Sequence, residues 1–480
     1  MSLMSELPSG LPIGEGWVPA RAHEPVRFPF DGSVIGQSPI ADEVLASSAL
    51  DAALAVEQIA FDLPSRTRNA ILMRAHDQVS QRRSDLEELL VLETGKPLRD
   101  CRTEVDRALL TMELSAQEAM RIHGETVPVD LLAAGDGMSA YYTRVPIGVV
   151  VGIAGFNYPF LLAMHKIAPA IAAGCPVICK PAPQTPFATL WLAHILREAA
   201  ASERAPRSLV QVVTGAAGVG ETLTADPRIG AVSFTGSAAV GHRIAKAAAP
   251  RKVLLELGSN AALVVAADAD LDAAARAVAT GGFYASGQAC ISVQRLIVEA
   301  PVYDEFIELA AAKVSQLRFG DPREPDTQVS RLIDVRATER VKSWITEAVS
   351  AGAAEVVSGT TGESLTPTLL SDVDLDAEIW REEVFGPVVV ARAAANMDAA
   401  FDLVNESRYG LHASVFTSSL HTAMRAIRRL KVGGVVINEV PGFRSDAMPY
   451  GGVKDSGIGR EGPRYAVEEL TVTRMAVIRA

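Results

Sequence analysis

Short runs of β-branched and other apolar residues alternate with Ala-rich amphipathic stretches along most of this chain. The run Val177–Lys180, for example, is followed by the stretch Ala188–Ala201, and the run Ala231–Phe234 is followed by Val240–Ala249. Strands that alternate with helices in this way are typical of βαβ units with a parallel sheet. Because 480 residues are too many for one core, we expect an α/β fold with at least two domains.

The same periodicity predicts the positions of individual elements. Strands are predicted at Gly148–Ile153, Val177–Lys180, Leu209–Val213, Ala231–Phe234, Val253–Leu257, Leu263–Val265, Leu296–Val298, Val388–Ala391 and Gly434–Asn438. Helices are predicted at Ala46–Phe61, Thr67–Arg82, Arg83–Thr94, Leu98–His123, Ala188–Ala201, Val240–Ala249, Ala274–Ala279, Tyr303–Leu317 and Ala337–Ala351.

Two segments do not follow this alternation of strands and helices. Glu125–Val145 is predicted to form a hairpin, in which residues 126–129 and 138–145 flank a turn at Gly135–Gly137. Leu470–Ile478 alternates as a strand does, and nothing after it in the sequence would cover its edge. Such an edge invites pairing with another chain. The alternative is a β-arm that folds back on its own subunit.

Composition restricts the possible partners. The net charge of −12 argues against nucleic acid and against an anionic membrane surface. No apolar run reaches the length of a membrane span, and the first residues lack a basic stretch followed by an apolar core, so no membrane segment or signal peptide is expected. The four cysteines lack zinc-type pairing and are expected to be reduced thiols in a cytoplasmic protein without a metal site.

Two residues offer chemistry in an otherwise apolar context. Cys290 follows Ala289 and the Gly/Ser-rich stretch Gly281–Gln288, and its thiol is a candidate nucleophile. Glu256 lies in the apolar run Val253–Leu257, where a charge is costly unless it has a role. The simpler alternatives are a cysteine that packs as a small hydrophobe and a carboxylate that caps a turn at the end of a strand.

Several ordered motifs accompany this pair. They are Phe156-Asn157-Tyr158-Pro159, Lys180-Pro181-Ala182, Phe234-Thr235-Gly236-Ser237, Leu255-Glu256-Leu257-Gly258, Gly287-Gln288-Ala289-Cys290 and Glu382-Glu383-Val384-Phe385-Gly386-Pro387. From about Val149 to Gly462 the chain resembles the aldehyde dehydrogenase superfamily. The resemblance implies a Rossmann-like dinucleotide-binding domain (1–123 and 147–257), an α/β catalytic domain (258–445) and oligomerisation arms (124–146 and 460–480) that join a homodimer or homotetramer.

The resemblance also implies a reaction, the oxidation of a small-molecule aldehyde to a carboxylic acid with NAD or NADP. Cys290 would be the nucleophile that forms a thiohemiacetal and then a thioester, and Glu256 would activate the water that hydrolyses the thioester. Asn157 would donate its amide to the oxyanion; otherwise it belongs to an ordinary Asn-x-Pro turn. Two alternatives remain, a coenzyme A–acylating dehydrogenase, which generally lacks the base, and a non-catalytic cofactor-binding protein of the same fold.

The cofactor site has a signal of its own. A strand, a glycine turn and a helix start follow one another around Gly236 and Ser237, and such a helix N-terminus binds anions. In the family this turn holds the pyrophosphate, so Gly215–Gly220 is interpreted as a tight loop before a helix. The resemblance assigns Lys180 to the adenosine ribose and Glu383 to the nicotinamide ribose, with Phe385 and Phe156 as further cofactor contacts.

Departures from the family pattern bear on cofactor choice and local geometry. Pro183 stands where NAD-preferring members often have the glutamate that repels a 2′-phosphate, so we expect NADP to be accepted as well as NAD. Ser259 stands where the family commonly has glycine, and a positive φ there would disfavour it.

The substrate is predicted from the segment Gly442–Gly457, which resembles members that act on lactaldehyde and on small anionic or phosphorylated aldehydes. Arg444 and Arg107 would pair with an anionic group of the substrate, and Tyr158 would form part of the wall. The alternatives are structural support of the mouth for Arg444, and an ion pair with Asp106, Glu104 or another nearby acid for Arg107.

Overall fold

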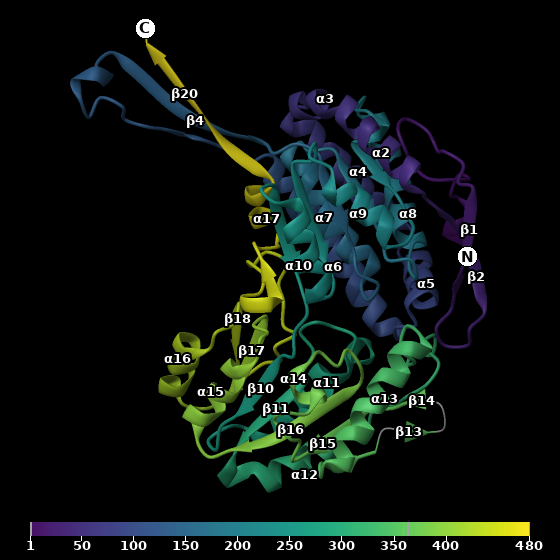
Figure 1. Ribbon diagram of the computed structural model, residues 1–480, viewed down its shortest axis with the longest axis vertical. Helices are drawn as coiled ribbons and strands as arrows, with labels where there is room; N and C mark the ends of the chain where they lie inside the picture. Colours follow the sequence, from purple (N-terminus) through teal and green to yellow (C-terminus); the bar gives the residue numbers. More distant parts are fainter. Residues whose placement is uncertain (1, 359, 362–363, 480) are drawn as a thin grey trace.

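Five short, mostly buried parallel strands form the centre of the first sheet. A computed structural model describes residues 2–358, 360–361 and 364–479 (Figure 1). The strand order is β19-β9-β8-β5-β6-β7, and β19 alone is antiparallel to its neighbour. The strands are β5 (Val150–Ile153), β6 (Val177–Lys180), β7 (Val210–Val212), β8 (Ala231–Thr235), β9 (Lys252–Glu256) and β19 (Gly457–Ile458).

Helices cover this sheet, which explains why its strands are continuous apolar runs. The connecting helices are α7 (Pro159–Ala173), α8 (Phe187–Ser202), α9 (Ala217–Ala225) and α10 (Ala238–Ala248). The N-terminal part adds a hairpin, β1 (Ala22–Arg27) and β2 (Val34–Ile40), and the helices α1 (Ser2–Ser5), α2 (Glu43–Ala55), α3 (Glu57–Asp62), α4 (Ser65–Gln81), α5 (Arg83–Thr94) and α6 (Leu98–Ala119). Helix α6 packs along α7 and so reaches the carboxyl edge of the sheet.

The second sheet has the order β12-β15-β16-β11-β10-β17-β18, with only β12 antiparallel. Its strands are β10 (Ala262–Val265), β11 (Arg295–Glu299), β12 (Ala354–Val357), β15 (Thr368–Ser371), β16 (Val388–Ala394), β17 (His412–Phe416) and β18 (Gly434–Ile437); β13 (Thr360–Thr361) and β14 (Ser364–Leu365) form a separate pair. Its helices are α11 (Leu271–Phe283), α12 (Tyr303–Val314), α13 (Val335–Ser350), α14 (Glu378–Arg381), α15 (Met397–Glu406) and α16 (Leu420–Arg429). Alternate side chains of its strands enter two cores, Val264 on one face and Leu263 on the other.

A third, three-stranded sheet projects from the body as an arm (Figure 1). Strand β20 (Thr471–Arg479) pairs along its length with β4 (Met138–Pro146), which also pairs with β3 (Glu125–Thr126). Helix α17 (Pro463–Glu469) leads into β20. The order β20-β4-β3 leaves one edge of β20 without a partner strand among the residues that the structure describes.

Short 3₁₀ helices complete the chain: η1 (Ala133–Gly135), η2 (Arg207–Leu209), η3 (Tyr284–Gly287), η4 (Ala300–Val302) and η5 (Lys454–Ser456). Within the described ranges, no helix combines the length and the apolar character that crossing a membrane requires.

The α/β class and the parallel sheets expected from the alternation are confirmed. The single helix predicted at Ala46–Phe61 is wrong, because it breaks into α2 and α3 at Val56, whose φ is −109° and ψ 5°. The first strand of the predicted hairpin is shorter than expected, since Pro128 has no N–H for the ladder. The domain boundaries given above stay a prediction. Strand β19 (457–458) belongs to the first sheet although it lies outside the ranges predicted for the dinucleotide-binding domain.

Candidate active site

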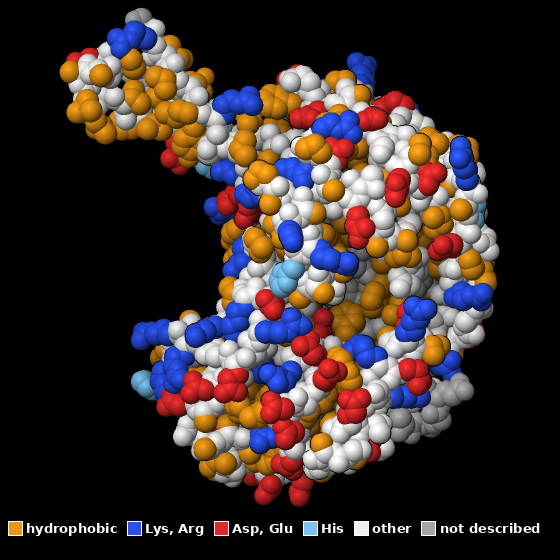
Figure 2. Space-filling view, in the orientation of Figure 1, with side chains coloured by type: hydrophobic (Ala, Val, Ile, Leu, Met, Phe, Trp, Pro, Cys, Tyr) orange, Lys and Arg blue, Asp and Glu red, His pale blue; other side chains and the backbone are white. Residues whose placement is uncertain are grey.

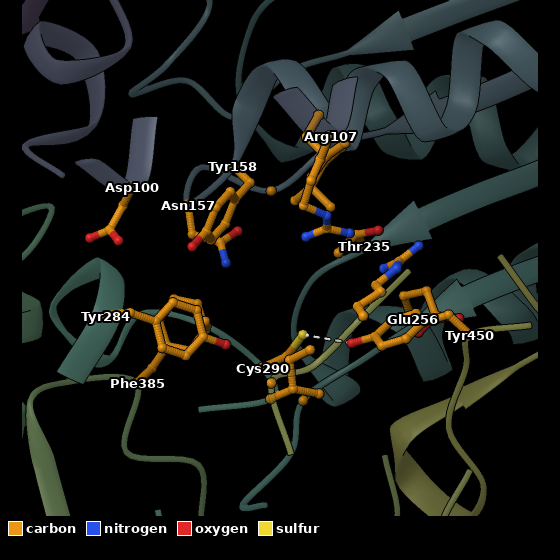
Figure 3. A pocket seen from close by; sticks show the side chains of 18 of the residues that line it. Asp100, Arg107, Asn157, Tyr158, Thr235, Glu256, Tyr284, Cys290, Phe385 and Tyr450 are labelled. Carbon is orange, nitrogen blue, oxygen red and sulfur yellow. Dashed lines mark hydrogen bonds between the residues drawn. The ribbon is translucent and has the colours of Figure 1, made fainter. Parts of the chain in front are cut away.

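A cavity of about 570 Å³ is lined by residues from both large sheets and their connections (Figure 3). The predicted site residues that line it are Cys290, Glu256, Asn157, Gly236, Ser237, Glu383, Phe385, Phe156, Arg107, Arg444 and Tyr158. Lys180 is not among them. Residues far apart in the sequence therefore meet in one chamber that is large enough for a small organic substrate beside a planar ring.

The loop before Cys290 has an unusual backbone. Ala285 and Ser286 have φ values of 48° and 57°, and Gly287 follows with 71°. Consecutive left-handed non-glycine residues persist only where surrounding contacts hold them. Asp100, on α6, supplies one such contact, because its Oδ2 accepts a hydrogen bond of 2.9 Å from the Ala285 N–H. The loop thus presents Cys290 from a strained, anchored backbone.

Cys290 has a hydrogen-bond partner at its sulfur. Its Sγ lies 3.2 Å from the hydroxyl oxygen of Tyr450 (Figure 3). Burial raises the pKa of the Cys290 thiol to about 12, although the Tyr450 hydrogen bond and the charge of Arg444 act in the opposite direction. The thiol is therefore protonated in this state, and it needs a base or a further positive charge to become the nucleophilic thiolate.

Glu256 ends strand β9 with a buried carboxyl group. Its Oε2 has no hydrogen-bond partner among the described residues. Burial and then the nearby charge of Glu461 raise the pKa of Glu256 well above its usual range. A buried carboxyl group in the lining of a cavity, with an oxygen that has no partner, can accept a proton from water or from a thiol, as a general base must.

Asn157 follows strand β5 and points into the cavity (Figure 3). Its Nδ2 donates a hydrogen bond of 2.8 Å to the main-chain oxygen of Gln288, two residues before Cys290. An amide nitrogen carries two hydrogens, so the second remains for an oxygen next to the sulfur. This bond ties the amide to the loop that carries the thiol.

The turn after β8 fits a pyrophosphate. Helix α10 begins at Ala238, directly after Ser237, so the N–H groups of its first turn are open to a ligand. A Cβ on Gly236 would lie 2.5 Å from the tip of the Phe234 ring, so a larger residue here would force that ring to move. The closeness of backbone and ring explains why Gly236 occurs in this motif.

Glu383 and the aromatic residues beside it fit a nicotinamide riboside. The Glu383 Oε1 accepts a hydrogen bond of 3.0 Å from the Ser259 N–H, and burial raises the pKa of Glu383 to about 7. The rings of Phe156 and Phe385 meet edge to face at 5.6 Å between centroids. Ser259 does not have a positive φ, so the predicted strain at this serine is absent.

Lys180 lies apart from the cavity, two strands from β8 at the same carboxyl edge of the sheet. Lys180 pairs in register with Ile153, and Ile153 pairs with Phe234. Two strand spacings amount to roughly 10 Å. Burial lowers the pKa of Lys180 to about 8, and its stem passes Gly220, where a Cβ would be 3.4 Å from the Lys180 Cδ. The loop predicted at Gly215–Gly220 is shorter than expected, because helix α9 already starts at Ala217.

Arg107 pairs with an acid that the sequence does not indicate. Its guanidinium makes two bonds to the carboxylate of Asp446, at 3.0 and 2.8 Å. The ion pair expected as the alternative role of Arg107 is therefore present, but not with the two acids named from the sequence, because Asp106 pairs with Arg83 and Glu104 pairs with Lys96. Arg107 nevertheless lines the cavity.

Arg444 lies over the ring of Tyr450, with its guanidinium carbon 3.7 Å from the ring centroid. It contacts Glu461 at 3.4 Å and Asp446 at 3.6 Å, and its side chain is 6% exposed. Its Nε has no hydrogen-bond partner among the described residues. Arg444 thus lines the cavity while its guanidinium is held in place by Asp446, Glu461 and the Tyr450 ring.

Tyr450 and His165 line the cavity but are absent from the sequence predictions, as are Asp446, Lys166 and Glu461, which form ion pairs next to it. Lys166 contacts Glu461 and donates a 2.6 Å hydrogen bond to the Thr235 hydroxyl. The sequence offers a signal for two of them, since His165 and Lys166 are polar residues in an otherwise apolar stretch, which forms the fully buried helix α7. Glu461 and Asp446 lie in loops without such a pattern and become visible only in three dimensions.

Comparison with known proteins gives consistent matches. The model of the aldehyde dehydrogenase family matches residues 17–476. A 3-sulfolactaldehyde dehydrogenase of Priestia aryabhattai is 42% identical over 86% of each chain. Crystal structures of aldehyde dehydrogenase 21 from Physcomitrella patens with its product succinate, and of glyceraldehyde-3-phosphate dehydrogenase from Methanocaldococcus jannaschii with NADP, superpose with TM-scores of 0.94 and 0.92. The first is 35% identical, and the match covers 98% of this chain and 98% of that one. The second is 34% identical, and the match covers 96% of this chain and 100% of that one.

Proposed function

The chain belongs to the aldehyde dehydrogenase family, and we propose that it acts on a small aldehyde that carries a hydroxyl or anionic group, with Cys290 as nucleophile. As a member of this family it is an enzyme that oxidises an aldehyde to a carboxylic acid with NAD or NADP. The observation that carries the proposal is the meeting of Cys290, Asn157 and Glu256 in one cavity.

In this proposal, the reaction begins when Glu256 takes the proton of the Cys290 thiol and passes it to water, and the thiolate adds to the aldehyde carbon. The new oxyanion accepts hydrogen bonds from the Asn157 amide and from the Cys290 main-chain N–H. The thiohemiacetal then loses a hydride, and a thioester on Cys290 remains. The oxidised nicotinamide, when bound, supplies the acceptor for that hydride.

Glu256 completes the turnover by taking a proton from the water that attacks the thioester. The acid leaves, and Cys290 regains its thiol. The unpartnered Oε2 of Glu256 supports this role, since a carboxylate that is already hydrogen-bonded is a weaker base. The presence of this base favours hydrolysis over transfer of the acyl group to coenzyme A.

The residues that would hold the cofactor follow the carboxyl edge of the first sheet. Lys180 would bind the adenosine ribose, Gly236 and Ser237 the pyrophosphate, and Glu383 the nicotinamide ribose, with Phe385 and Phe156 beside the ring. Glu383 as a carboxylate would accept hydrogen bonds from ribose hydroxyls. Since Pro183 is exposed and uncharged, it would not repel a 2′-phosphate, so we infer that NADP is used besides NAD.

The charges around the cavity support an anionic substrate group. Three cationic side chains, Arg107, Arg444 and Lys166, face two carboxylates, Asp446 and Glu461. Burial opposes ionisation of both carboxyl groups, but their positively charged partners hold the pKa of each below its usual range. Arg107 and Arg444 both line the cavity, and the N–H groups of their guanidinium groups would bind a carboxylate, phosphate or sulfonate on the substrate.

We infer further that the arm joins subunits into a homodimer or homotetramer in the cytoplasm. Hydrophobic side chains gather on the arm in Figure 2, where Leu131 and Leu132 are 82% and 78% exposed and Val477 is 57% exposed. Exposed apolar surface of this kind, next to an unpaired strand edge, favours association. Four free cysteines fit a reducing compartment.

The test is an assay of NAD and NADP reduction with propanal, 2-hydroxypropanal and succinic semialdehyde, with and without coenzyme A. We expect a free acid as product, formed equally well without coenzyme A, and no turnover by C290A, which should still bind cofactor. Formation of an acyl-coenzyme A instead of an acid would exclude the hydrolytic route. Full activity of C290A would exclude the proposed nucleophile.

A further inference from the structure

A carboxylate from α6 caps the N-terminus of α7. The first turn of α7 has two N–H groups without an acceptor in the helix itself, those of Phe160 and Leu161, because Pro159 has no N–H. Both donate to the Oε1 of Glu104, at 2.9 and 3.1 Å. Asn157 lies two residues before the start of α7, so the backbone that carries the proposed oxyanion donor leads directly into the capped turn.

The second oxygen of Glu104 also has a partner. Its Oε2 forms an ion pair with the Lys96 Nζ, and the side chains of Glu104 and Lys96 are 0% and 1% exposed. The same Nζ lies 3.7 Å from the centroid of the Tyr158 ring, next to Asn157 in the chain. A buried ion pair adds little net stability, because desolvation of the two charges offsets their attraction. The pair is therefore better explained by the geometry that it imposes on this turn.

Glu104 is the middle one of three charged α6 side chains that reach the site. Asp100, four positions before it, holds the loop of Cys290, and Arg107, three positions after it, lines the cavity. Residues at these spacings lie on one face of a helix. Asp100 and Arg107 accordingly appear on either side of Asn157 in Figure 3. One face of α6 thus contacts both the thiol loop and the turn before α7, and it can hold the two at a fixed separation.

We propose that Glu104 is a positioning residue of the oxyanion site, which sets the place of the Asn157 amide relative to the Cys290 sulfur by capping α7. The proposal rests on the proposed function, in which these two groups hold the reacting carbonyl. Glu104 is not among the residues that line the cavity, so it acts through Asn157 and not on the substrate. A shift of about 1 Å in such a donor costs roughly 10²-fold in rate.

The substitution E104Q disturbs the cap without changing the size of the side chain. A carboxylate accepts hydrogen bonds on both oxygens, whereas a carboxamide has one oxygen and one NH₂ group. In either orientation, the NH₂ group would face donors, which are the Lys96 ammonium on one side and the N–H groups of α7 on the other. The side chain must therefore move, and the turn that carries Asn157 moves with it.

The experiment measures formation of reduced cofactor in a single turnover, with propanal and saturating NAD, in the unmodified protein, E104Q, N157A and the double variant. We expect E104Q to slow this step about tenfold to a hundredfold. The steady-state KM for propanal should stay nearly unchanged, because the lost interaction exists only in the transition state. In the N157A background, E104Q should change the rate less than about twofold, since residues that act through one another are not additive.

E93Q is the matched control. Glu93 is also buried, and it caps the next helix, α8, through the N–H groups of Phe187 and Ala188, the second at 3.0 Å. Helix α8 does not carry Asn157. E93Q therefore disturbs the same kind of contact at another helix, and its effect on the single-turnover rate should be small and equal with and without Asn157.

An equal loss of rate for E104Q in both backgrounds would overturn the proposal and leave Glu104 as a stabilising cap only. An unchanged rate in E104Q would overturn it as well, and so would a loss in E93Q that disappears in the N157A background. E104D, which keeps the charge but shortens the reach, gives the same comparison if E104Q does not fold. Normal turnover of N157A would instead refute the oxyanion role in the proposed function, so the two failures are distinguishable.

Discussion

The hydroxyl of Tyr450 lies 3.2 Å from the sulfur of Cys290, and the Arg444 guanidinium stacks on the same phenol ring. The sequence points to Cys290 and Arg444 for separate reasons, and Tyr450 connects them. Burial raises the pKa of Tyr450 well above its usual range, so the phenol remains a donor when the thiol ionises. A hydrogen bond to an anion is stronger than one to a neutral group, so this contact favours the thiolate.

Replacing Tyr450 by phenylalanine should therefore raise the pKa of Cys290. A hydrogen bond to a charged group contributes about 1.5–3 kcal/mol, which corresponds to roughly one to two pKa units. The pH dependence of Cys290 alkylation by iodoacetamide measures this change, and the profile of Y450F should move to higher pH. Y303F serves as control. An unshifted profile in Y450F would mean that the contact with the sulfur is only steric.

Replacing Glu256 by glutamine should slow release of the acid rather than its formation. A general base contributes about 10²–10⁴ to the rate of the step that it serves. Stopped-flow measurement should show a burst of one reduced cofactor per site, followed by a slow steady state. Glu256 acts only when ionised, and its pKa is raised, so the unmodified enzyme should lose steady-state rate as the pH falls through that pKa. The steady-state rate of E256Q should lack this pH dependence. A trace of E256Q without a burst would mean that Glu256 is not the base for hydrolysis of the thioester.

Replacing Asn157 by alanine removes one of the two proposed oxyanion donors. Loss of one such donor costs about 10²–10³ in turnover. Because the same amide holds the Gln288 carbonyl at 2.8 Å, N157D is a useful companion variant, since it keeps the size but not the donor. Both variants should bind cofactor normally, as cofactor fluorescence titration can check. Normal turnover in N157D would contradict the proposed oxyanion role.

Replacing Pro183 by glutamate should shift cofactor preference towards NAD. The new carboxylate would repel a 2′-phosphate, and like charges placed together cost several kcal/mol. We expect kcat/KM with NADP to fall at least about tenfold relative to NAD. P183Q is the control of matched length without charge, and its ratio should stay near that of the unmodified protein. Exclusive use of NAD by the unmodified protein would refute the expectation that this enzyme also uses NADP.

Replacing Arg444 by glutamine should raise KM for anionic aldehydes more than for propanal. A charge-assisted contact contributes about 1.5–3 kcal/mol, or roughly one to two orders of magnitude. Succinic semialdehyde and propanal are the substrates to compare. R464A, at an exposed arginine of α17 that pairs with Glu468, is the control. Equal effects on both aldehydes would assign Arg444 to support of Tyr450 and the cavity mouth.

Local sequence patterns predict much of the fold, because hydrophobic periodicity reflects local geometry and burial. The strand Val177–Lys180 and the helix Arg83–Thr94 have the bounds that their patterns predict. Helix α7 was not predicted, since all of its residues are buried and an apolar face cannot be distinguished from a polar one. Strand β17 was not predicted either, and it too is buried along its whole length.

The sequence by itself determined the α/β class, the family motifs and the residue types for the chemistry, because each depends on neighbours within a few positions. Only the tertiary structure decided that Arg107 pairs with Asp446 rather than with Asp106 or Glu104. It also decided that Tyr450 contacts Cys290 and that Asp100 reaches the loop at Ala285. These partners are separated by well over a hundred residues, and hydrogen bonds at about 3 Å follow the packing of sheets and helices, which no local pattern encodes.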